Sequence, residues 1–247
     1  MPLLFYYLKL ITRAKTFVSG LFILAISCSL CVFFAGSGPT EQDQFLLIFL
    51  ASAIRIIAVI FSIILTCFFV QKIYDRQELS HLLSKGVSKF NMLLSLYGAF
   101  FIYALFFVVL YLGLFVFSGL HNSSILWLAG SMIELFFMIQ IALFFSLILS
   151  NFMVSVSASM GLYILGRLMG NLILISQSGK SQFGDILNIA LQGISFFIPR
   201  FDLMIQSQWL LYQTPLSMMH YYPIIQCGIL SIFCFIACLY DLKRKEF

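Results

Sequence analysis

Three ionisable residues lie inside long apolar runs of the sequence, where a charge can do chemistry that a surface charge cannot. Arg55, Glu134 and Arg167 are each flanked mainly by aliphatic and aromatic side chains. A charged group in the hydrocarbon of a membrane is costly and is usually paired or functional. At a helical rise of about 1.5 Å per residue, Arg55 lies about 15 Å, Glu134 about 13 Å and Arg167 about 12 Å from the outer ends of their runs. We therefore expect all three in one layer, slightly outside the middle of the membrane.

The charges in this layer do not balance, because one carboxylate can neutralise only one of the two arginines. Two interpretations follow from the residues. The three side chains can form an ion-pair network that fixes the packing of the helices. Alternatively, one arginine faces a cavity and meets an anionic headgroup or substrate. The sequence leaves both interpretations open.

Other motifs in the sequence do not indicate a nucleotide-binding, metal-binding or catalytic site. Ser178-Gly-Lys-Ser181 has the spelling of the end of a phosphate-binding loop, but Leu174 stands where the first glycine is needed. His81, His121 and His220 stand in separate segments without ligand spacing, so we expect no metal site. No nucleophile stands beside a base within a span, so we do not expect an enzyme.

The composition identifies the solvent of this chain as mainly lipid. Of its 247 residues, 62% are hydrophobic and 9% are charged, whereas a soluble domain carries about a quarter charged residues. The net charge of +5 comes from too few basic residues for a nucleic-acid interface. Five of the six cysteines fall inside apolar runs and are expected to be packing residues. We predict an all-α polytopic membrane protein with lipid as a partner and no nucleic acid.

Six apolar runs are long enough to cross a membrane as helices, and they lack the alternation of a membrane barrel. The first is expected to be a retained span rather than a cleaved signal, and an amphipathic helix over Leu3–Ala14 precedes it. We treat residues 1–247 as one transmembrane domain. The runs are Phe17–Phe34, Phe45–Val70, Leu93–Phe117, Ile125–Leu149, Phe152–Ile175 and Tyr222–Leu239.

The distribution of Lys and Arg predicts the orientation. Outside the spans, ten of these residues fall on one side and only Lys180 and Arg200 on the other. Both termini and the connection between the second and third spans are therefore expected to be cytoplasmic. The ten residues are Lys9, Arg13, Lys15, Lys72, Arg76, Lys85, Lys89, Lys243, Arg244 and Lys245.

The outer segment Ser176–Tyr221 is expected to be partly helical. Ile186–Phe197 and Leu203–Tyr212 are amphipathic, are separated by Pro199, and are predicted to lie in or dip into the outer interface. A structural lid and a gate are both compatible with this pattern. Aromatic residues around it indicate a belt at the membrane surface: Trp127, Trp209, Tyr212, Tyr221 and Tyr222.

Small residues recur in the fifth run and predict close helix packing. Gly166-Arg-Leu-Met-Gly170 is a GxxxG motif, and Gly161 precedes it. We favour contact within the bundle over a seam between two copies.

The most polar stretch, Tyr74–Phe90, predicts a short amphipathic helix between the second and third spans. Asp75 can cap it with Glu78 at the third position, and its leucines share one face. Ser88 can cap the following span. A simple solvated connector is the alternative.

This stretch resembles the coupling helix of ABC-2 type transporter permeases. The similarity rests on Glu78-Leu-Ser-His-Leu-Leu-Ser-Lys-Gly-Val-Ser-Lys89, together with the layout of six spans and inside termini. The sequence departs from the usual motif at Leu79-Ser80, where Gly-Thr is common, and at Gly86, where Pro is common.

The resemblance implies the membrane-spanning permease subunit of an exporter in a bacterial cytoplasmic (inner) membrane. It implies a separate cytoplasmic ABC ATPase that binds ATP and Mg²⁺, and a second permease copy or paralogue; this chain would bind no cofactor. Arg76, Gln77, Glu78 and His81 would contact the ATPase. The rival functions are a secondary transporter or channel that uses Arg55, Glu134 and Arg167 as a relay, and a membrane scaffold for a maturation system.

Overall fold

The computed structural model describes residues 2–13, 15–35, 42–75, 87–118, 122–149, 151–178, 182–206 and 221–244. These residues are almost entirely helical, and no strand occurs among them. The helices are α1 (Pro2–Thr12), α2 (Lys15–Ala35), α3 (Gln42–Asp75), α5 (Lys89–Ser118), α6 (Asn122–Ile148), α7 (Phe152–Ser178), α8 (Gln182–Phe197), α9 (Phe201–Met204) and α10 (Tyr221–Arg244).

Five segments of the described residues are long and apolar enough to cross a membrane. They are Ile48–Ile73, Lys89–Phe107, Ile125–Ile148, Phe152–Gln177 and Tyr221–Arg244. This confirms the all-helical fold, and the five candidate spans fit a multi-pass membrane protein. The predicted first span is helical as α2, with 21 residues, but it is not among the five, so the count of six spans stays a prediction.

The helix boundaries follow the apolar runs and extend past them by a few residues. At the start of α5 the backbone N–H of Asn91 donates to the Ser88 hydroxyl at 3.2 Å, which confirms Ser88 as the cap of this span. Asp75 is the last residue of α3. Residues 76–86 of the predicted amphipathic helix lie outside the described residues.

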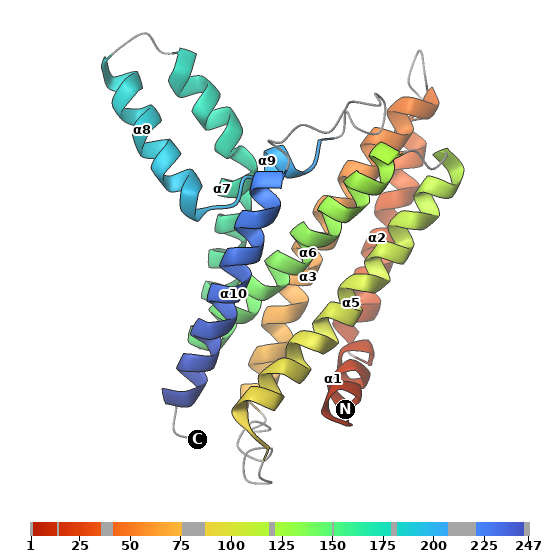
Figure 1. Cartoon of the computed structure of the whole chain (residues 1–247). Coiled ribbons are helices and arrows are strands. Elements are labelled where there is room, and N and C mark those ends of the chain that lie inside the picture. The colour runs from red at the N-terminus through yellow and green to blue at the C-terminus, as the bar shows by residue number, and fades with distance from the viewer. Residues whose placement is uncertain are drawn as a thin grey trace.

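The long helices α3 and α6 form the centre of the bundle. α3 packs against α2, α6 and α7, and α6 also packs against α5 and α10. α1 lies against α5 and buries Tyr7 and Ile11. Both chain termini lie at one end of the bundle, the end at which α3 stops and α5 begins (Figure 1).

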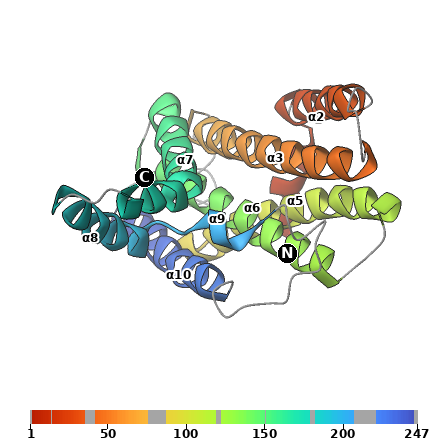
Figure 2. The same cartoon turned by 90° about the horizontal axis from the view of Figure 1, so that it is seen from above.

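The segment after α7 turns back into the helical layer. α8 runs back alongside α7 (Figure 1), and α9 packs against both α7 and α10, as the view from above shows (Figure 2). The predicted helix over Leu203–Tyr212 is wrong at its start, because α9 ends at Met204 and Ile205 is extended (φ −140°, ψ 109°). Ile205 is buried and its N–H closes the turn on the Phe201 carbonyl, so packing stops the helix there.

A candidate intramembrane polar site

An ion pair joins α3 and α6 in the interior of the bundle. Arg55 Nε lies 3.6 Å from Glu134 Oε2, and the two residues are only 1% and 0% exposed. Ala51 and Ala58, one turn before and after Arg55, are also buried. These small side chains allow α6 to approach α3 closely enough for the two charged groups to meet.

Trp127 covers the guanidinium of Arg55. The Arg55 Cζ atom lies 5.9 Å from the centre of the Trp127 ring, a cation–π distance. Tyr111 of α5 meets the same ring edge-on, with centroids 5.7 Å apart. Trp127 is fully buried, so its predicted place in a membrane-surface belt is wrong. Tyr221 and Tyr222, at 48% and 46% exposed, have the exposure that such a belt requires.

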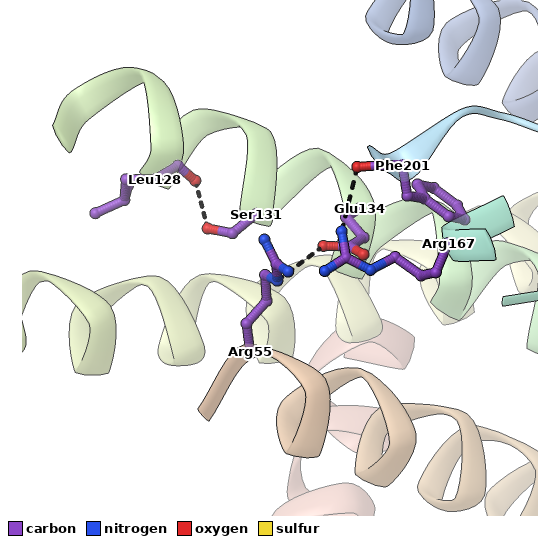
Figure 3. Close-up of polar contacts among 6 residues, drawn as sticks. All are labelled: Arg55, Leu128, Ser131, Glu134, Arg167 and Phe201. Atoms are coloured by element: carbon purple, nitrogen blue, oxygen red, sulfur yellow. Dashed lines mark hydrogen bonds and ion pairs between the residues drawn. The ribbon is translucent and has the colours of Figure 1, made fainter. Parts of the chain in front are cut away.

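Arg167 of α7 joins the same layer. It interacts electrostatically with Arg55, and its Nη1 donates to the backbone carbonyl of Phe201 at 3.3 Å. Figure 3 shows Arg55 and Arg167 both directed toward the region of Glu134. Arg167 is half-buried, in contrast to the other two. The structure thus brings the three charges of the apolar runs together, with one carboxylate for two guanidinium groups.

Several polar atoms around this layer have no hydrogen-bond partner among the described residues. They include Nε and Nη1 of Arg55, both carboxylate oxygens of Glu134, and the hydroxyls of Tyr111 and Tyr163. Both tyrosines interact electrostatically with Arg55 and Glu134. Buried polar atoms in native proteins normally have partners, so a group of unsatisfied ones indicates a place for water or a ligand.

The tyrosines were not among the residues predicted from the sequence. Tyr163 precedes Arg167 by four residues and so lies one helical turn away on the same side of α7. The fixed rise of a helix, which places the three charges at one depth, therefore also indicates Tyr163 from the sequence. Tyr111 offers no such signal, because its neighbours in α5 are apolar.

Gln226 of α10 holds the end of α8. Its Nε2 donates to the carbonyls of Ser195 and Phe196 at 2.8 Å each, and lies 3.4 Å from that of Ile198. The last carbonyls of a helix lack partners within the helix, and irregular backbone at membrane depth needs protein partners. Gln226 was missed in the sequence, although an amide inside an apolar run is a signal of this kind.

The glycines of α7 make room for the turn between α8 and α9. A Cβ at Gly166 would lie 2.8 Å from the Pro199 carbonyl oxygen, and one at Gly170 would meet the Asp202 side chain. The motif therefore packs within the chain, against a turn rather than another span. At Gly161 no atom of the described residues lies within 4 Å of such a Cβ, so its predicted role in helix packing stays a prediction.

The remaining predictions concern the coupling residues, the cysteines and metal binding. Arg76, Gln77, Glu78 and His81 lie outside the described residues. Four cysteines that the structure describes are buried and form no disulfide: Cys67, Cys227, Cys234 and Cys238. Within the described ranges, no group of three or more His, Cys, Asp or Glu side chains could hold a metal ion.

No protein-family model matches this sequence, and no curated protein or solved structure matches it either.

Proposed function

We propose that this chain is the membrane-spanning permease subunit of an ATP-driven exporter of the ABC-2 type. The observation that carries the proposal is the stretch Glu78–Lys89, whose sequence resembles the coupling helix of such permeases. In the sequence this stretch follows α3 and leads into α5, and α3 stops and α5 begins at the end of the bundle where both termini lie (Figure 1). The charged residues of this connection support docking of a cytoplasmic partner at that end of the protein.

The continuity of α3 supports a mechanical role for this connection. α3 is one helix of 34 residues, and Arg55 lies about 30 Å along it from Asp75. A displacement at Asp75 would therefore be transmitted to the polar layer. Since α3 packs against α2 and α7, tilting of these helices would alter the layer. ATP and Mg²⁺ would act on the partner ATPase, and a second permease copy or paralogue would complete the conduit.

The test is a pairing experiment, in which the chain is purified together with its partners and charge reversals are compared at the two ends of the bundle. The tagged chain is extracted gently with its native partners, and the captured complex is assayed for ATP hydrolysis and transport. We expect a co-purifying ATPase, and loss of coupling between hydrolysis and transport in Glu78→Lys and Arg76→Glu. Asp43→Lys, at the opposite end of α3, is the matched control and should leave coupling unchanged. An intact complex without ATPase activity, or unchanged coupling in both variants, would contradict the proposal.

The buried Arg55–Glu134 pair favours one second candidate, a secondary transporter or channel with an intramembrane relay. A paired carboxylate and guanidinium at membrane depth is typical of proton and ion pathways. This candidate predicts activity of the purified chain in vesicles, driven by an ion gradient without ATP. A membrane scaffold for a maturation system would show neither activity.

A further inference from the structure

We propose that Arg167, with Arg55 behind it, binds the acidic group of an amphiphile: a carboxylate or phosphate carried on an apolar chain. That this amphiphile is the exported cargo rests on the proposed function. The binding itself does not, because every residue involved belongs to this chain.

The net positive charge of the layer favours the binding of an anion. Arg55 and Arg167 face a single carboxylate, Glu134, which leaves one positive charge in excess among the described groups. The nearby Arg200 and Asp202 do not change this sum, because they pair with each other at 2.9 Å. An excess charge at membrane depth is costly, and a bound anion lowers that cost.

The hydrogen-bonding groups also favour an anion. Arg55 has two unsatisfied nitrogens, and the hydroxyls of Tyr111 and Tyr163 are unsatisfied as well. Among the described residues, Arg167 donates one hydrogen bond, to the backbone carbonyl of Phe201. The two oxygens of Glu134 are unsatisfied acceptors in the same layer, but one carboxylate has fewer acceptor sites than two guanidinium groups have N–H donors. Guanidinium groups bind carboxylate and phosphate oxygens through paired, charge-assisted hydrogen bonds.

A ligand can reach Arg167 from the surface of the bundle, but it cannot reach the other two charged residues. Arg167 is half-buried, whereas Arg55 and Glu134 are sealed. Arg167 lies at the border between the face of α7 that packs against the α8–α9 turn and the open face. The open face is apolar beside it, with Ile164 53% and Leu168 46% exposed. An acidic headgroup can reach Arg167 from this face while its apolar chain lies against these side chains.

Glu134 acts in this arrangement as a competing internal carboxylate. Its carboxylate lies 3.6 Å from Arg55 Nε and neutralises that charge without a hydrogen bond. Replacing it by glutamine would raise the net charge of the layer by one, so anion binding should become tighter. A network that serves packing alone would lose stability without this gain.

The experiment compares two lipids that differ only in the acidic group. Lysophosphatidic acid and monooleoylglycerol, with the same oleoyl chain, are titrated against the purified full chain in nonionic detergent. We expect the phosphate lipid to bind more tightly. Arg167→Gln should weaken its binding about tenfold or more, the loss expected for a charge-assisted hydrogen bond. Glu134→Gln should strengthen it several-fold, and Arg167→Lys should retain part of it.

Controls separate the alternatives. Lys72→Gln, in the last turn of α3 and about 25 Å along that helix from Arg55, also removes a positive charge and should bind the phosphate lipid as the original chain does. Glycerol 3-phosphate supplies the headgroup without the chain and should bind far more weakly. Equal binding of the two lipids, no gain in Glu134→Gln, or equal binding of glycerol 3-phosphate would each overturn the proposal. If Arg167→Gln does not fold, Glu134→Gln and Arg167→Lys still decide it. Since no ATPase is present, failure here leaves the pairing experiment on the proposed function unaffected.

Discussion

Arg167, in the middle of α7, donates a hydrogen bond of 3.3 Å to the backbone carbonyl of Phe201, the first residue of α9. The Phe201 side chain is fully buried and packs against Phe137 and Tyr163. The same arginine thus belongs to the polar layer and holds the turn that covers it. Because Gln226 of α10 holds the end of α8, this turn is fixed from two different spans.

Replacement of Gln226 by leucine should loosen the turn. The change leaves the carbonyls of Ser195 and Phe196 without their donor, and an unsatisfied buried polar group costs about 1–3 kcal/mol. We expect the melting temperature in detergent to fall by several degrees. Gln192→Leu is the matched control, because this exposed amide donates to Asn188 within α8 and has no other hydrogen bond among the described residues. Equal effects of the two changes would contradict the role of Gln226.

The glycines of α7 should differ in their tolerance of alanine. A methyl group at Gly166 meets the Pro199 carbonyl and the Phe201 ring, and overpacking costs about 1–3 kcal/mol. At Gly161 no atom of the residues that the structure describes lies within 4 Å of an added Cβ, so alanine should be neutral or stabilising by up to about 1 kcal/mol through helix propensity. Thermal unfolding of the two variants measures the difference. Similar stability of both would show that the turn does not pack on Gly166.

The ion pair of Arg55 and Glu134 should behave as a coupled unit. Removing one member of a buried pair costs about 3–5 kcal/mol. We expect Glu134→Leu to be worse than Arg55→Met, because the first leaves two arginines without a carboxylate and the second leaves Glu134 with Arg167. The double variant should cost less than the sum, by more than about 1 kcal/mol. Additive costs in a double-mutant cycle would argue against direct contact.

Trp127 should report on the layer by its fluorescence. The chain has two tryptophans, so Trp209→Phe leaves Trp127 alone. Because Trp127 is fully buried, its emission should be resistant to acrylamide. Arg55→Met removes the cation from its ring face and should shift the emission. Ready quenching in the Trp209→Phe variant would place Trp127 at the surface instead, as the aromatic-belt interpretation required.

Some of these relationships could be predicted from the sequence. The common depth of Arg55, Glu134 and Arg167 follows from the fixed rise of a helix, once each apolar run is taken as a span. The cap at Ser88 follows from a local rule, because it involves only the next turn of backbone. The coupling residues Arg76, Gln77, Glu78 and His81 stay a prediction.

Other features depended on contacts between distant segments. Gly161 and Gly166 look alike in the sequence, but only Gly166 faces the turn. Trp127 opens its span as a belt residue would, yet it covers Arg55 of another helix. The helix expected over Leu203–Tyr212 stops at Met204, because Ile205 is buried in an extended conformation.

The sequence by itself determined a helical membrane protein, the extent of most of its long helices and the depth of its buried charges. These properties depend on hydropathy and on the fixed geometry of one helix, and neither needs a neighbour. Only the tertiary structure decided that one carboxylate faces two arginines, that Trp127 lies inside, and that Gln226 and Arg167 hold the turn between α8 and α9. Each of these depends on the rotation and pairing of helices, which packing sets and which the linear order of apolar residues does not encode.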